Sequence, residues 1–242
     1  GATDNHEPVA HSAAAAQTEC TSPAGAAVQL DASTSSDADS TPGTRDDIAA
    51  YEWFESFGLP AQALIATGDT ASPSLSLGSH VITLRITDRA GATATASLTI
   101  TVADTRKPAL SATLSREFLW PPSHQMAHIH ASVDAQDACG ATQVLLSSIT
   151  SDEADDAPGK ADGSTINDIQ GAVFGTPDFD FLVRSGRSEL GDGGVYTVTY
   201  RATDATRNVS WITRRVSVPM NHRDLSRLKH SSGTTRPQIL DG

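Results

Sequence analysis

Apolar and polar residues alternate along most of this chain, which is the pattern of strands that bury one face. Residues 80–88 place Ile82, Leu84 and Ile86 at alternate positions, and residues 96–102 repeat the pattern after a turn at Gly91. Residues 129–133 and 196–202 alternate in the same way, whereas extended helical periodicity is missing. A period of two favours half-buried strands. The pattern therefore predicts an all-β chain.

The segment from Val102 to Pro108 separates two such sets of strands. Lys107 precedes a proline, which biases it toward an extended backbone. We predict a β-sandwich over residues 1–104 and a second over 105–220, with a long loop over 151–178. Residues 221–242 are expected to form a tail or linker that begins with a short helix. A loop as long as 151–178 usually carries function or an internal fold.

The net charge of −12 is spread unevenly and limits the partners of the protein. Residues 1–104 hold 3 Lys/Arg against 13 Asp/Glu, and the remainder holds 14 against 16. An acidic first half argues against nucleic acid and anionic membrane surfaces, which attract basic patches. No run of eighteen apolar residues exists, so membrane insertion is not expected. Any export signal is expected to lie outside these residues.

The first half resembles a PKD-type (polycystic-kidney-disease) domain. The resemblance rests on Val28-Gln-Leu-Asp-Ala-Ser-Thr-Ser-Ser-Asp-Ala-Asp39, Tyr51-Glu-Trp53 and the stretch from Leu77 to Gly91. It implies a seven-stranded immunoglobulin-like sandwich that is extracellular and often accessory to secreted hydrolases or surface proteins. The sequence departs from the family at Ser40, which replaces a usual glycine, and at the insertion 41–47.

The second half resembles immunoglobulin-like modules repeated in bacterial secreted proteins, which are distantly similar to hyalin repeats. The motifs are Leu119-Trp-Pro-Pro-Ser-His124, Asp137-Ala-Cys-Gly140, Asn167-Asp-Ile-Gln-Gly171 and the stretch from Tyr200 to Asn208. Ser123 stands where the common pattern has asparagine. Together the two resemblances imply two tandem immunoglobulin-like β-sandwiches, secreted or on the bacterial cell surface, with no enzymatic activity.

Acidic residues gather at the pole where the chain enters the first sandwich. Asp37 and Asp39 follow the second strand, Asp88 ends the sixth, and Asn5 opens the domain. Calcium takes six to eight oxygen ligands in loose geometry, so this set predicts a Ca²⁺ site. Some PKD-type domains hold calcium at the positions that these residues resemble. The alternative is that each aspartate caps backbone N–H groups in a turn.

A second calcium site is predicted at the joint between the sandwiches. Asp134, Asp137 and Asp204 should fall at the pole of the second domain that lies beside Asp104. Tandem cadherin-like domains illustrate such a calcium-stiffened linker. Alternatively, Asp204 caps the hairpin that follows it and Asp137 merely ends a strand.

The two cysteines, Cys20 and Cys139, should face the same joint from opposite sides, because each lies in a turn at the corresponding pole. We predict that they form a disulfide that clamps the sandwiches, as an exported protein permits. In the chain-entropy model such a long loop is worth about 4–5 kcal/mol. Two free buried thiols are the alternative.

The opposite pole of the second sandwich offers further candidates. Four acidic residues of the long loop are a second potential calcium set: Asp155, Asp156, Asp162 and Asp168. The favoured interpretation is that Arg184 and Arg187 pair with these carboxylates and hold the loop down. Trp120 and His124 are possible ligand contacts, since an exposed indole can stack on a sugar. The alternative is that Trp120, which two prolines follow, is a packed corner.

His128 and His130 share one strand face, and imidazole pairs suit zinc or copper. Neither cysteine nor His124 completes a matching set, and cysteine spacing typical of zinc sites is absent. We interpret these histidines as part of a solvated strand face.

No catalytic motif is present: Gly-x-Ser-x-Gly, His-Glu-x-x-His and phosphate-cradling glycine loops are all missing. The sequence predicts a non-catalytic extracellular spacer and adhesion region of a larger bacterial exoprotein, stiffened by Ca²⁺ and a disulfide. Its partners are then the neighbouring domains of the parent chain. The alternative is an accessory module that binds polysaccharide or a fibrous surface protein for a secreted hydrolase.

Overall fold

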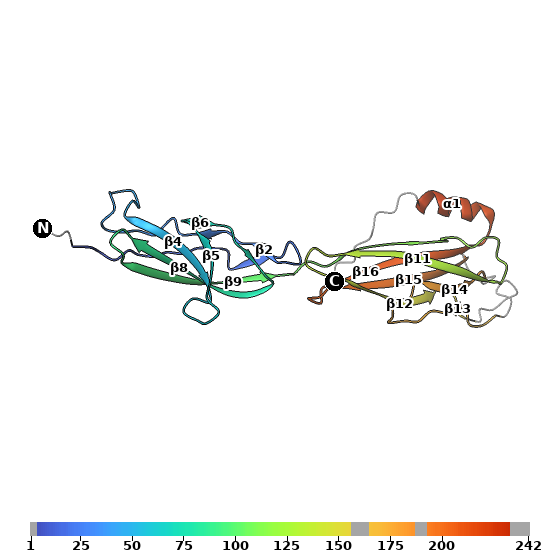
Figure 1. Ribbon diagram of the computed structural model, residues 1–242. Coiled ribbons are helices and arrows are strands. Elements are labelled where there is room, and N and C mark those ends of the chain that lie inside the picture. The colour runs from blue at the N-terminus through green and yellow to red at the C-terminus, as the bar shows by residue number, and fades with distance from the viewer. Residues whose placement is uncertain (1–3, 156–164, 187–192, 233–242) are drawn as a thin grey trace. The chain divides into compact units, whose positions relative to one another are not determined.

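The chain divides into two compact units, Gly1–Thr105 and Arg106–Gly242. Figure 1 shows the computed structural model, which describes residues 4–155, 165–186 and 193–232, with the backbone alone for 228–232. Almost all regular structure is β, and each unit is an immunoglobulin-like β-sandwich, as predicted.

The first unit is built on a five-stranded sheet. Its strands in spatial order are β1 (Gln17–Glu19), β9 (Thr93–Ala103), β8 (Gly78–Asp88), β4 (Ile48–Glu55) and β5 (Ala63–Thr67). All neighbours in this sheet are antiparallel except β1 and β9, which run parallel. Two short ladders form the second layer: β2 (Ala26–Ala27) with β7 (Ser74–Leu75), and β3 (Leu30–Asp31) with β6 (Thr70–Ala71).

Alternation along β8 explains how this sheet folds onto its core. Ile82, Leu84 and Ile86 are completely buried, as the period of two predicts. Trp53 on the neighbouring strand is also completely buried, and its indole N–H donates a 3.0 Å hydrogen bond to the Gly68 carbonyl. Burial of such side chains supplies most of the favourable free energy of folding.

The second unit packs two antiparallel sheets face to face. The first sheet contains β10 (Ala109–Leu114), β11 (Met126–Gln136), β14 (Asp180–Arg184) and β13 (Ile169–Gln170), in that order. The second contains β12 (Gln143–Ser151), β15 (Gly193–Thr203) and β16 (Val209–Pro219). Ile129, Leu146, Phe181 and Tyr200 are central to the core between them. The predicted loop 151–178 is not entirely irregular, because β13 forms within it and pairs with β14.

The helix α1 (His222–Ser232) follows the last strand, in the region where a short helix was expected. Asn221 caps it, since its side-chain oxygen accepts hydrogen bonds from the N–H groups of Arg223 and Asp224. Leu225 is buried. Among the described residues, no helix has the length and apolar character needed to cross a membrane.

Candidate functional site

Three carboxylates converge at one end of the first sandwich. Asp37 follows β3, Asp47 immediately precedes β4, and Asp88 ends β8. One carboxylate oxygen of each lies within 4.8 Å of the others. The register of the sheet brings two of them together, because Ile48 pairs directly with Asp88.

Two of these carboxylates are deeply buried, with exposed fractions of 8% for Asp37 and 2% for Asp88. Asp88 accepts hydrogen bonds from the Ala92 N–H at 2.8 Å and from the Asn5 amide at 2.9 Å. Asp37 Oδ1 accepts one from the Asp39 N–H at 2.8 Å. The other oxygen, Asp37 Oδ2, is buried and has no hydrogen-bond partner among the described residues. Burying an unpaired carboxylate oxygen is costly, so the geometry fits a cation at this point.

The electrostatics of the cluster point the same way. Burial raises the pKa of Asp47, and the negative charges of Asp37 and Asp88 raise it further, against the opposing effect of Arg89. The hydrogen bond from Asn5, together with backbone N–H groups, lowers the pKa of Asp88 despite its burial. A bound cation would relieve the repulsion among these groups.

The structure brings together part of the predicted calcium set. Asp37 and Asp88 lie in the cluster, and Asn5 contacts Asp88. Asp39 instead pairs with His6, whose backbone N–H and imidazole Nδ1 lie 2.7 and 2.9 Å from its carboxylate oxygens. The sequence reasoning missed Asp47, which closes the insertion at 41–47. Its place at the acidic pole, directly before the strand β4, is the feature of the sequence that could have indicated it.

The residues predicted for the joint site belong to different units. Asp104 lies in the first unit; Asp134, Asp137 and Asp204 lie in the second. Asp204 is a turn cap, since its carboxylate accepts hydrogen bonds from the N–H groups of Thr206 and Asn208 at 2.9 and 2.8 Å. Asp137 Oδ1 accepts one from the Cys139 N–H at 2.7 Å. The hydrogen bonds expected from the turn-capping alternative are therefore present. The calcium site at the joint stays a prediction.

Neither of the two cysteines is free: Cys20 and Cys139 are both disulfide-bonded. The expected disulfide is thus present, and the alternative of two free thiols is not observed.

Arginine holds down the part of the long loop that the structure describes. Arg184 Nε lies 2.6 Å from Asp168 Oδ1, and both side chains are largely buried. The same guanidinium also donates to the carbonyls of His124 and Ile166. Asp155 accepts hydrogen bonds from the N–H groups of Asn167 and Asp168. Asp156, Asp162 and Arg187 lie outside the described residues.

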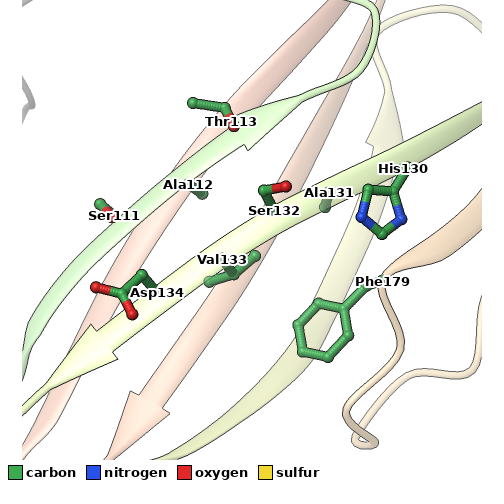
Figure 2. A pocket seen from close by; sticks show the side chains of 9 residues that line it. All are labelled: Ser111, Ala112, Thr113, His130, Ala131, Ser132, Val133, Asp134 and Phe179. Atoms are coloured by element: carbon green, nitrogen blue, oxygen red, sulfur yellow. The ribbon is translucent and has the colours of Figure 1, made fainter.

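Trp120 and His124 line neither of two grooves found on the described part of the second unit. Trp120 is 38% exposed, so it is neither a fully packed corner nor a free platform. One open groove of about 450 Å³ lies along β10 and β11 and ends at His130 and Phe179 (Figure 2). Another runs beside Glu153, Asp155 and Asp168. Because Trp120 and His124 belong to neither groove, their role in ligand binding stays a prediction.

The fold defines the class of protein: tandem immunoglobulin-like β-sandwiches. No protein-family model matches the chain, and no curated protein matches it. Several solved structures align with it at low similarity. The PKD1 domain of Epp from Vibrio anguillarum is 24% identical, over 42% of this chain and 99% of that chain, with a TM-score of 0.30. This domain is of the type that the first half of the sequence resembles.

Two further structures align with both units. The fibronectin(III)-like modules of CbhA from Clostridium thermocellum are 10% identical, over 88% of this chain and 97% of that chain, with a TM-score of 0.30. A Ca²⁺-stabilized adhesin with which an Antarctic bacterium binds ice is 11% identical, over 88% of this chain and 49% of that chain, with a TM-score of 0.33. Similarities this low carry no functional argument, so the function of this chain is inferred from its own residues.

Proposed function

We propose that this chain is a non-catalytic pair of extracellular modules, acting as a spacer and adhesion region of a larger bacterial secreted or surface protein. Ca²⁺ held by Asp37, Asp47 and Asp88 rigidifies the first module, and the disulfide braces the pair. The observation that carries the proposal is the buried Asp37 Oδ2, which has no hydrogen-bond partner among the described residues although its carboxyl group lies beside two others.

The chemistry of the donor set favours calcium over other cations. Three carboxylates offer only hard oxygen ligands, and the Asn5 side chain adds an amide oxygen if it turns toward the ion. Ca²⁺ accepts six to eight such ligands with irregular geometry and completes its shell with water. Mg²⁺ requires near-octahedral geometry and releases its water reluctantly, while zinc and copper prefer nitrogen or sulfur.

Binding at this cluster would stiffen the module because the ligands come from distant parts of the chain. Asp37, Asp47 and Asp88 belong to three separate segments, and Asn5 comes from the strand-free opening segment. An ion that binds only the folded state adds its binding free energy to the free energy of unfolding, about 2.7 kcal/mol at a concentration of one hundred times the Kd. Extracellular calcium and an oxidising environment both suit an exported spacer.

The test compares thermal unfolding in Ca²⁺ and in EGTA for the wild-type chain and for Asp37→Asn. We expect millimolar Ca²⁺ to raise the melting temperature of the wild-type first module by several degrees. Asp37→Asn keeps the shape of the side chain and removes one charge, so it should lose most of this response. In EGTA the variant should melt no lower than the wild type, because carboxylate repulsion is reduced.

A matched control removes one negative charge elsewhere. Glu117 is exposed and lies in the second unit, so Glu117→Gln should retain the full calcium response. An unchanged wild-type melting temperature in millimolar Ca²⁺ would overturn the proposal. An equal calcium response in Asp37→Asn would assign the effect to some other group.

A further inference from the structure

Two histidines and an aspartate meet on the outer face of the second sandwich. His128 and His130 are two residues apart on β11, so their side chains leave the same face of the sheet. Asp180 on the adjacent strand β14 lies directly opposite His130. Solvent can reach all three side chains, whose exposed fractions are 60% for His128, 52% for His130 and 55% for Asp180.

Both imidazoles approach the same carboxylate oxygen. His128 Nε2 lies 3.2 Å from Asp180 Oδ1, and His130 Nδ1 lies 2.9 Å from it. A tetrahedral zinc site with ligand bonds of about 2.0–2.1 Å separates neighbouring donor atoms by about 3.3 Å. Both imidazole–carboxylate separations are therefore already close to the value that a zinc ion requires. The three donor atoms do not yet all lie within 4.8 Å of one another, so an imidazole ring must rotate to bring the two nitrogens together.

The backbone beneath this trio is firmly held. β11 is an inner strand of its sheet, hydrogen-bonded to β10 on one side and to β14 on the other. Its inward residues, Ile129 and Ala131, are buried in the core. A metal site on such a strand needs only side-chain rotations, so little ordering of the backbone opposes binding.

We propose that His128, His130 and Asp180 form a surface site for a divalent transition-metal ion of the zinc type. Two imidazole nitrogens and one carboxylate oxygen make a three-ligand site whose remaining positions open to solvent. Each imidazole binds through its unprotonated nitrogen, so the metal replaces the contacts that the rings now make with Asp180. The nitrogen ligands separate this site from the all-oxygen cluster in the first unit. His130 also ends the groove along β10 and β11, where Figure 2 shows it near Phe179.

The experiment is calorimetric titration of the whole chain with Zn²⁺ at neutral pH, in a calcium concentration high enough to occupy carboxylate sites. We expect the wild-type chain to bind one zinc ion through this trio. His128→Gln and His130→Gln should each weaken zinc binding by about tenfold or more. Removing a residue that only hydrogen-bonds to a metal ligand already lowers metal affinity by about that factor, and these variants remove a ligand itself. Asp180→Asn should weaken it as well.

The first unit supplies a matched control. His6 is 62% exposed and pairs with Asp39 at 2.9 Å, but no second imidazole pairs with Asp39 among the described residues. His6→Gln should therefore leave zinc affinity unchanged. The variants are exposed, and their unchanged melting temperatures in EGTA would verify folding. Absence of zinc binding to the wild-type chain, or wild-type affinity in both His128→Gln and His130→Gln, would overturn the proposal. Neither result bears on the calcium response of the first unit.

Discussion

His80 shows how one buried side chain makes stability depend on pH. Its side chain is buried, its Nδ1 lies 2.6 Å from Glu55 Oε1, and its Nε2 lies 2.8 Å from the Ser76 carbonyl oxygen. Burial lowers the pKa of His80, but the hydrogen bonds to Glu55 and Ser76 outweigh burial and raise it above 6.5. Since both ring nitrogens face acceptors, the doubly protonated imidazolium is the form that the fold favours.

We predict that His80→Gln removes this pH dependence. A raised pKa in the folded state means that His80 contributes its full stability below its ordinary pKa, and loses that contribution as pH rises through the raised value. The variant should lose about 1–3 kcal/mol of unfolding free energy at low pH, and less at high pH. Urea unfolding at about pH 5.5 and about pH 8.5 measures the difference.

The control for this prediction is His11→Gln, because His11 is exposed and hydrogen-bonds to Ser35 through its backbone groups. The stability of this variant should follow the wild-type pH profile. If His80→Gln and the wild type gave parallel profiles, protonation of His80 would not contribute to stability.

At the scale of elements, a tight turn fixes the start of β2. Gly25 closes this turn: its N–H donates to the Ser22 carbonyl at 2.8 Å, and its carbonyl accepts from the N–H groups of Thr21 and Ser22. Its φ is +110°, and a Cβ there would lie 1.8 Å from the Leu75 carbonyl oxygen on β7. The backbone of β7 therefore excludes any side chain at this position.

We predict that Gly25→Ala destabilises the first unit by at least about 2 kcal/mol, because backbone must move in addition to the strain of a positive φ. Gly91 is the matched comparison, with a φ of +95° and open space around its Cβ position. Gly91→Ala should lower the free energy of unfolding only by the strain of the positive φ, about 1 kcal/mol. Denaturant unfolding of both variants measures the difference between their losses of unfolding free energy. Equal losses would show that the contact with β7 adds nothing to the destabilisation.

Local alternation was sufficient to predict the long strands β8, β9, β11 and β15, because burial on one side imposes a period of two on residues such as Ile82 and Leu84. The candidate sites depended on contacts that local patterns do not encode. Asp47 joins the cluster through the register of β4 against β8, and Asp180 reaches His130 through the register of β14 against β11. Such pairings between distant segments depend on the whole fold.

At the scale of the whole molecule, the disulfide is the main covalent constraint. Cys20 and Cys139 enclose a loop of roughly 120 residues, which the chain-entropy model values at about 4–5 kcal/mol. We predict that reduction lowers the free energy of complete unfolding by about this amount, because the unfolded chain gains conformational freedom. Unfolding in denaturant with and without reductant measures the loss.

Two measurements make the disulfide prediction specific. Thiol titration of the denatured, unreduced protein should find no free thiol. The double variant Cys20→Ser/Cys139→Ser should unfold identically with and without reductant. A reductant effect of the same size in that variant would show that the loss of stability has another origin.

The parallel pairing of β1 with β9 has a mechanical consequence. Gln17, Thr18 and Glu19 pair in register with Thr101, Val102 and Ala103, so the opening and closing strands of the first unit run side by side in the same direction. Tension that pulls the two ends of this unit apart slides these strands past one another and loads their hydrogen bonds together. An antiparallel pair pulled from one end would instead open one bond at a time. The parallel pairing thus gives the first unit a shear-resistant contact at the edge of its sheet.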